Sequence, residues 1–228
     1  KNAGIKVMPV VASVAMARMM ERCGADAVIA EGTEAGGHIG EITTMVLVPQ
    51  VVDAVNIPVV AAGGIADGRG FAAAFMLGAQ GVQMGTRFVA TEECDADPAF
   101  KESYVHARKE DIEIIQSPVG MPGRAIRNDF IKRVEKEKQP VDKCYNCMKK
   151  CNPNEVPYCI TKALVDAVNG DINNGLIFCG ANVGRINEMT TVHELMKELV
   201  LPTDKKIQEE NETHDIQNVY SQRDKMIS

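Results

Sequence analysis

Short apolar runs and longer amphipathic segments alternate through the first 90 residues of the chain. Apolar runs that end in glycine are typical of buried parallel strands, whereas apolar residues spaced i, i+3, i+4, i+7 are typical of helices. The predicted strands cover residues 5–12, 26–31, 59–62 and 81–86. Predicted helices follow the first of them, begin at Thr43 or Thr44, and cover residues 69–77. The pattern therefore indicates repeated strand–helix units.

The first predicted helix carries a stripe of sulfur-containing side chains. Met16, Met19, Met20 and Cys23 follow the i, i+3, i+4, i+7 spacing, and Gly24 is a typical residue to end the helix. This stripe predicts a buried helix face, with Cys23 in the core.

Two short sequences recur along the chain. Pro-Val-Val-Ala occurs at residues 9–12 and 58–61, and Gly-Ala-x-x-Val occurs at residues 24–28 and 78–82. Such an internal repeat supports successive βα units and a parallel sheet. A closed (β/α)8 barrel has eight strands, so four strands predict an α/β fold that holds the second half of a TIM barrel.

The pattern changes after this half-barrel, which is assigned to residues 1–92. Residues 93–140 are expected to form a helical region packed on the barrel, followed by a cysteine-containing helical extension over 141–201 and a poorly ordered polar tail over 202–228. Within these regions the pattern predicts helices over residues 98–109, 125–138, 160–169 and 192–201, and a short strand over 112–116.

Composition narrows the class of function. The 228 residues are 45% hydrophobic and 25% charged, as in ordinary globular proteins, and no apolar run is long enough to span a membrane. The net charge of −6, the absence of Trp and the 4% aromatic content argue against a nucleic-acid partner. The start of the chain shows no signal-peptide pattern, so we expect a cytoplasmic protein.

Glycines stand at the carboxyl ends of two predicted neighbouring strands. Gly63 and Gly64 follow one strand, and Gly85 and Thr86 end the next. A backbone without Cβ can approach a ligand closely and present its N–H groups to an anion. Because phosphates bind at the last two strands of many barrels, this pair predicts a cradle for the phosphate of a cofactor.

A glycine-rich loop follows the strand that ends at Glu31. Residues 32–40 contain His38, and the loop lies at the face where barrels carry out chemistry. A lone histidine is usually structural, but in this position a proton donor, base or orienting group is favoured. Glu34 is expected at a solvated loop edge, and for Glu31 solvation and function remain equal alternatives.

These motifs together resemble a known family. Residues 6–138 are similar to the FMN-dependent family that contains nitronate monooxygenase and enoyl-[acyl-carrier-protein] reductase II, in its C-terminal portion. The matching motifs are residues 31–40 with His38, residues 61–68 and residues 83–88. The continuation over residues 39–45 and 48–52 is closer to the reductase branch.

The resemblance implies an FMN site and a catalytic histidine, His38. The resemblance implies that the phosphate is bound by Gly63, Gly64, Gly85 and Thr86, with Gln83 and Met84 at the same strand end. The flavin ring or ribityl chain would be approached by Glu31, Gly36 and Gly37. In the reductase interpretation, NAD(P)H is the co-substrate and a small-molecule or acyl-carrier-protein-bound enoyl thioester is reduced. The alternative within the family is oxidation of alkyl nitronates with O2. A homodimer also remains open.

Four cysteines lie within 16 residues of the extension. Their spacing, Cys144-x2-Cys147-x3-Cys151-x7-Cys159, can hold an iron–sulfur cluster or zinc. Free thiols in a helical cap are the alternative, and Cys179 is a substitute candidate for Cys159. A non-catalytic metal-binding fragment is therefore a further functional alternative to the flavoenzyme.

Overall fold

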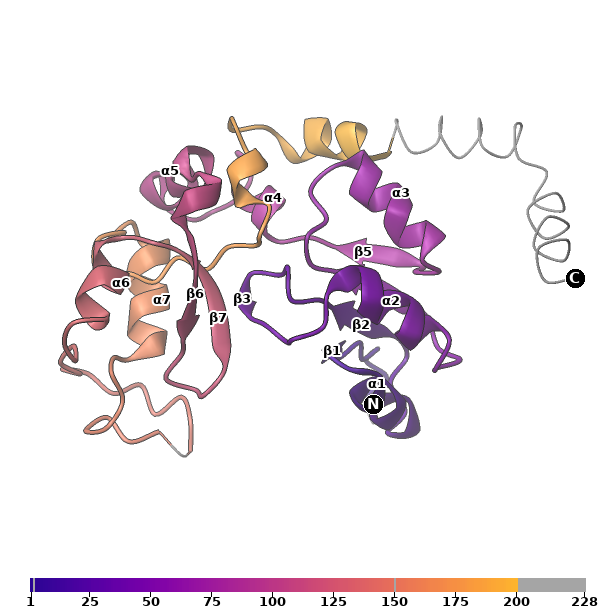
Figure 1. Cartoon of the computed structure of the whole chain (residues 1–228), viewed down its shortest axis with the longest axis horizontal. Helices are drawn as coiled ribbons and strands as arrows, with labels where there is room; N and C mark the ends of the chain where they lie inside the picture. Colours follow the sequence, from indigo (N-terminus) through magenta and orange to yellow (C-terminus); the bar gives the residue numbers. More distant parts are fainter. Residues whose placement is uncertain (2, 150, 201–228) are drawn as a thin grey trace, which may run out of the picture.

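Two sheets lie side by side in the computed structural model, which describes residues 1, 3–149 and 151–200 (Figure 1). One is parallel, with the strand order β1-β2-β4-β5, and the other is antiparallel, with the order β3-β7-β6. The parallel strands are β1 Val10–Val11, β2 Val28–Glu31, β4 Val59–Ala62 and β5 Gly81–Gln83. The four predicted parallel strands are confirmed in order and direction, although β1 and β5 are shorter than predicted.

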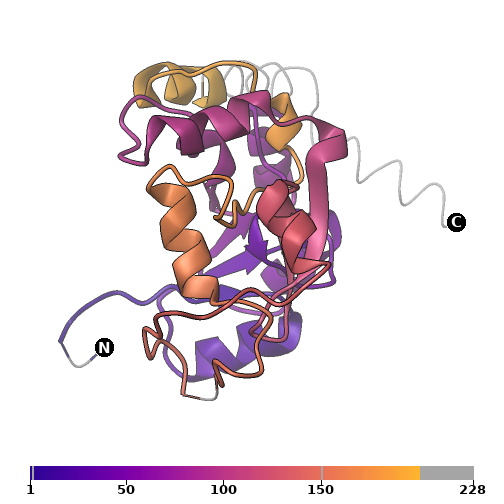
Figure 2. The same ribbon diagram turned by 90° about the vertical axis from the view of Figure 1, so that its left-hand side faces the viewer.

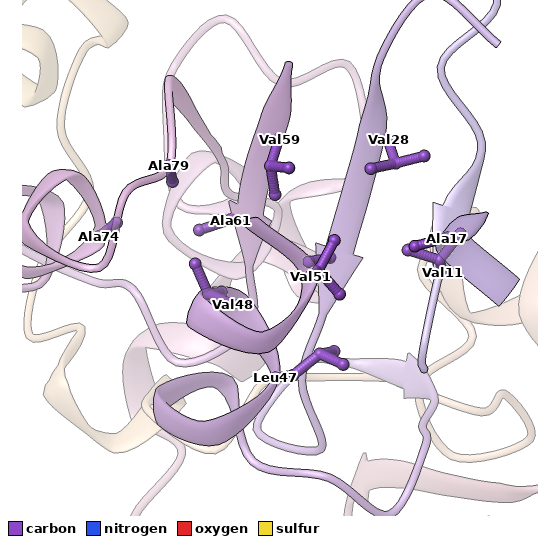
Figure 3. Packing of buried hydrophobic residues seen from close by; sticks show 11 residues of the cluster. Val11, Ala17, Val28, Leu47, Val48, Val51, Val59, Ala61, Ala74 and Ala79 are labelled. Carbon is purple, nitrogen blue, oxygen red and sulfur yellow. The ribbon is translucent and has the colours of Figure 1, made fainter. Parts of the chain in front are cut away.

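Three helices pack beside the parallel sheet: α1 Val14–Arg22, α2 Thr44–Val52 and α3 Gly68–Met76. Small and β-branched side chains fill the space between helices and strands, as Figure 3 shows for Val48, Val51 and Val59. Leu47, Val48 and Val51 of α2 are fully buried. Val48 and Val51, which are three residues apart, therefore lie on the core-facing side of the helix.

The predicted buried stripe of α1 is wrong for three of its four residues, since only Met20 is partly buried and packs against the core. Met16 and Met19 are 39% and 43% exposed, and Cys23 is exposed as well, whereas the buried residue of the helix is Ala17. Among the described elements, α1 has its main contacts with β1, β2 and α2. Those three elements cover one face of the helix, so Met16, Met19 and Cys23 remain exposed.

The second sheet consists of β3 Gly37–His38, β6 Ile112–Gln116 and β7 Pro122–Ile126. The predicted strand over 112–116 is confirmed, but the predicted helix over 125–138 is wrong at its start, because β7 pairs with both other strands. A helix, α6 Asp129–Val134, begins only after Asn128, whose side chain accepts a hydrogen bond from the Ile131 N–H. Strand pairing has overridden the local helical pattern.

Helices from the C-terminal part cover this second sheet. Helix α6 and α7 Ile160–Val168 lie beside β6 and β7 in both views (Figures 1 and 2), and they share a core that contains Phe130, Ala163 and Leu176. The remaining helical elements are α4 Thr86–Val89, α5 Pro98–His106, η1 Lys109–Asp111, η2 Val183–Arg185 and residues 192–200. No helix in the described ranges has the length and apolar character needed to cross a membrane. The tail predicted over 202–228 lies outside these ranges.

Asp67 ties the C-terminal segment to the parallel sheet. Its carboxylate caps α3 by accepting hydrogen bonds from Arg69 N and Gly70 N, and it pairs with the guanidinium groups of Arg69 and Arg185. Burial by itself raises the pKa of Asp67, but the hydrogen bonds outweigh it and hold the pKa well below its usual range. The carboxylate is therefore stabilising in its charged form.

We expect Asp67→Asn to lower the free energy of unfolding by about 1 kcal/mol at pH 7, through loss of the ion pairs and of the negative charge at the α3 N-terminus, while the asparagine oxygen can still cap the helix. Because the folded pKa is depressed, this contribution is present above about pH 4 and is lost as the pH falls through the folded pKa. Urea unfolding of both proteins between pH 3 and pH 7 measures the difference, which should shrink on the acid side. A difference that does not change with pH would contradict the role of the charge.

Candidate cofactor-binding site

A cavity of about 320 Å³ opens at the carboxyl ends of β2, β4 and β5. All nine predicted cofactor-binding residues line it, namely Glu31, Gly36, Gly37, Gly63, Gly64, Gln83, Met84, Gly85 and Thr86. They meet because parallel strands end at the same edge of the sheet.

The backbone at Gly63 and Gly64 is shaped for close contact. Both residues have positive φ angles, +98° and +72°. A Cβ at Gly63 would lie 2.9 Å from Gly32 O, and a Cβ at Gly64 would lie 3.0 Å from the Glu34 Cβ. Only glycine fits both the conformation and the space, so the chain can turn here and leave the cavity open.

Residues 178–182 of the C-terminal part form a wall of this cavity that the sequence analysis did not predict. Phe178, Gly180 and Asn182 line the cavity, together with Tyr104 of α5. Gly180 N donates a hydrogen bond to Thr86 Oγ1 at 2.8 Å, and the Asn182 side-chain amide donates to Gly64 O. Residues 176–180 form an apolar run that ends in glycine, the same pattern that marked the barrel strands, and it could have identified this segment.

His38 is not in a free loop, because strand β3 pairs it with Gly123 of β7. Its Nε2 shares a hydrogen bond of 2.8 Å with Ser117 Oγ, and its ring packs edge-on against Phe178 at 5.3 Å. The cavity wall is formed by Phe178 and not by His38 itself. Desolvation lowers the pKa of His38 below its ordinary value of 6.5, so the imidazole is neutral at pH 7.

A protein-family model matches the sequence that forms this half-barrel and its cavity. The model of the family described as nitronate monooxygenase matches residues 1–202, which is most of the chain. The chain belongs to the nitronate monooxygenase family.

The curated proteins that are similar to this member of the nitronate monooxygenase family carry different names. A probable nitronate monooxygenase from Staphylococcus saprophyticus is 44% identical over 145 residues, which are 59% of this chain and 41% of that protein. A (3aS,4S,5R,7aS)-5-hydroxy-7a-methyl-1-oxo-octahydro-1H-indene-4-carboxyl-CoA dehydrogenase from Rhodococcus jostii is 44% identical over 135 residues, 59% of this chain and 38% of the relative. The matches thus span less than half of each relative.

Solved structures in the family have the same fold. FabK from Thermotoga maritima has a TM-score of 0.79 and 44% identity, covering 92% of this chain and 65% of that one. A nitroalkane oxidase from Streptomyces ansochromogenes has a TM-score of 0.72 and 29% identity, covering 90% and 59%. The α/β fold predicted from the strand pattern is therefore confirmed, as part of a longer fold.

The two carboxylates near the cavity of this family member have different surroundings. Glu31 ends β2 and lines the cavity, and partial burial raises its pKa. The solvated loop edge predicted for Glu34 is wrong, because its carboxylate accepts hydrogen bonds from Thr44 N at 2.8 Å and Thr44 Oγ1 at 2.9 Å. Glu34 thus caps α2 in place of Thr43, whose side chain makes no capping bond.

We expect Glu34→Ala to lower the free energy of unfolding by about 1–2 kcal/mol, because the α2 N-terminus loses a charged acceptor. A double-mutant cycle with Thr44→Val, followed by urea unfolding, measures the coupling between the two side chains. Full additivity of the two single variants would show that the Thr44 hydroxyl does not contribute, and a Glu34→Ala protein as stable as the parent would contradict the capping role.

Arg124 of β7 holds the glycine-rich loop against the second sheet. Its guanidinium donates to Thr33 O at 2.7 Å and to Ala35 O at 3.3 Å. The backbone of the loop is also bonded through Glu34 O, which accepts from Ala181 N. The predicted cofactor-contacting residues Gly36 and Gly37 therefore follow a segment that is fixed on two sides.

The four clustered cysteines lie away from this cavity and line a second one. Desolvation, and then the thiols of Cys147, Cys144 and Cys159, raise the pKa of Cys151. Cys179 cannot replace Cys159, because it is 1% exposed in another part of the core, where burial raises its pKa to about 12. Across the described ranges, no three His, Cys, Asp or Glu side chains are grouped closely enough to hold a metal ion.

Proposed function

We propose that this chain is part of an FMN-dependent oxidoreductase that reduces an enoyl thioester with NAD(P)H. The observation that carries the proposal is the single cavity that gathers all nine residues expected at an FMN site. The FMN dependence of the nitronate monooxygenase and FabK family supports the choice of cofactor.

The residues present fit an FMN phosphate. The first amide groups of α4, at Thr86 and Arg87, have no partner within the helix and lie beside the glycines of the cradle. Thr86 Oγ1 already accepts the Gly180 N–H, so its own hydrogen is available for a phosphate oxygen. When FMN is bound, it supplies the hydride-transfer chemistry.

Apolar side chains complete the cavity and would keep water from the reacting atoms. Ala62, Ile65, Val89, Phe178 and Ile186 contribute this lining. The protein's part is then to bind, orient and dehydrate the reactants, which is the usual division of work in cofactor enzymes.

His38 is proposed to act on the substrate carbonyl or its α-carbon. A neutral imidazole whose Nε2 is engaged by Ser117 presents its other nitrogen at a set orientation. Because Phe178 lies between His38 and the cavity, substrate must enter beside that ring to reach the imidazole. Hydrogen bonding from His38 to a thioester oxygen would stabilise the charge that develops there.

Two relatives favour a thioester substrate. FabK, the enoyl-ACP reductase II, shares 44% identity over 92% of this chain, and the Rhodococcus jostii relative is named for a carboxyl-CoA substrate. The second candidate is oxidation of an alkyl nitronate with O2. It is supported by the name of the matching family and by the Staphylococcus saprophyticus relative.

Two assays on the full-length protein separate these candidates. We expect a flavin absorption spectrum, and NADH or NADPH consumption that depends on added crotonyl thioester, supplied as the CoA or the acyl-carrier-protein derivative. Oxygen uptake with an alkyl nitronate, without thioester-dependent NAD(P)H consumption, would instead establish the second candidate. A protein that binds no FMN would overturn both.

A further inference from the structure

A long irregular segment joins α6 to α7. Helix α6 ends at Val134 and α7 begins at Ile160, and the described residues between them form no helix or strand. Irregular segments of this length are uncommon in compact domains and are usually functional or disordered. This one is held in place, since Gln139 N donates to Pro157 O at 2.8 Å and Lys138 Nζ donates to Asn154 O.

The segment surrounds a cavity of about 260 Å³ whose lining is rich in thiols. Cys144, Cys147, Cys151 and Cys159 all line it, and each of them is free of a disulfide. The other lining residues are mainly apolar or aromatic, including Val141, Met148 and Ile160. Four thiols around one cavity form the donor set that iron–sulfur clusters and zinc prefer.

The backbone around the first two cysteines is arranged to support sulfur ligands. Asn146 has a φ of +50°, and its N–H donates to Cys144 Sγ at 3.4 Å. The hydroxyl of Thr161 donates to Cys147 Sγ at 3.0 Å. Hydrogen bonds to coordinating sulfurs are a general means by which proteins orient and tune thiolate ligands.

Tyr158 provides an independent observation at the same cavity. It is 3% exposed and lines the cavity, and its ring packs at 87° against Phe130. Its hydroxyl has no hydrogen-bond partner within the described residues. Buried hydroxyl groups are almost always satisfied, so this unpaired hydroxyl is unusual, although Tyr158 lines two further cavities as well as this one.

We propose that Cys144, Cys147, Cys151 and Cys159 bind a four-thiolate metal centre, separate from the flavin site. No three of these side chains already meet at one point in the described structure. A single zinc ion requires that convergence, whereas in a [4Fe–4S] cluster each thiolate binds a different iron atom. The spread of the four thiols around the cavity is therefore compatible with a cluster, and the metal analysis below decides between the two.

Metal analysis of the full chain, purified without oxygen and reconstituted with ferrous iron and sulfide or with zinc, tests the proposal. We expect bound iron with an equal amount of acid-labile sulfide, and loss of most of it in Cys147→Ser and Cys151→Ser. Cys23→Ser and Cys94→Ser are matched controls, because neither residue lines the cavity, and both should keep the metal. One zinc per chain, lost in the same two variants, would support the four-thiolate site with zinc as its ion.

Alkylation of the unmutated chain gives a second measurement that does not depend on how the variants fold. Metal loading should protect the four clustered thiols from iodoacetamide, as read by mass spectrometry, while exposed Cys23 is still modified. A chain that binds neither metal, or variants that keep the full amount, would overturn the proposal. Unprotected clustered thiols after metal loading would overturn it as well.

Discussion

Replacing His38 by alanine is expected to lower turnover by about 10²–10⁴-fold, the usual contribution of a positioned acid–base group. FMN should remain bound, because His38 does not line the cavity whereas all nine proposed cofactor-binding residues do. Steady-state kinetics with the active substrate, together with the flavin absorbance of each protein, measure both effects. Turnover equal to that of the parent would remove His38 from the mechanism.

The same histidine should set the acid limb of the pH profile. Burial holds the pKa of His38 below 6.5, so the neutral imidazole persists through neutral pH and is protonated only on the acid side. Activity that needs the neutral ring should therefore be constant near pH 7 and fall below pH 6.5. If activity already falls as the pH is lowered from values above 6.5, this assignment is contradicted.

Ser117→Ala is the control that separates orientation from chemistry. Ser117 is 5% exposed and holds Nε2 of His38, but it does not line the cavity. We expect turnover to fall less than in His38→Ala, because the imidazole is still present and has lost only its hydrogen-bond partner. The acid limb of the pH profile should change for the same reason. An identical profile in Ser117→Ala and the parent would show that the hydrogen bond has no part in positioning.

Replacing Gly64 by alanine is expected to abolish most FMN binding. The positive φ of +72° costs an alanine about 1–2 kcal/mol, and its Cβ would lie 3.0 Å from the Glu34 Cβ. The strained backbone at residue 64, or the neighbouring Glu34, has to shift to relieve this contact, and either shift disturbs the proposed phosphate cradle. Flavin content after purification and FMN titration of the apoprotein measure the loss.

Gly24→Ala is the matched control for backbone strain. Gly24 has a similar φ of +85°, and a Cβ there would meet nothing within 4 Å. It terminates α1 and does not line the cavity, so this variant should lose a comparable amount of stability and keep its FMN. If both variants bind FMN as the parent does, Gly64 does not form the phosphate cradle.

The half-barrel could be predicted because the sequence pattern of each strand lies within a few neighbouring residues. Short apolar runs such as Val59–Ala62, with β-branched residues and a glycine after them, are typical of buried parallel strands. Parallel strands in sequence then bring their carboxyl ends to one edge, so Gly63, Gly64, Gly85 and Thr86 had to meet. The nine cavity residues followed from this geometry together with the family resemblance.

The second sheet could not be predicted in the same way, because pairing between distant segments determines it. Residues 125 and 126 begin the predicted helix over 125–138, yet they belong to β7, which pairs with β3 and β6. The same pairing moves His38 from a free loop into a strand. Local propensity is a weak effect beside such long-range hydrogen bonding.

What the sequence determined by itself was the parallel βα half, the glycine cradle and the presence of a four-cysteine motif, since each depends on neighbours along the chain. Only the tertiary structure decided that Phe178, Gly180 and Asn182 close the cavity, that Glu34 caps α2, and that Met16 and Met19 of α1 are exposed. Those features depend on which surfaces meet after more than 80 residues of intervening chain or across packed elements. Contacts of that kind leave no periodic pattern in the sequence, because only the folded backbone brings the partners together.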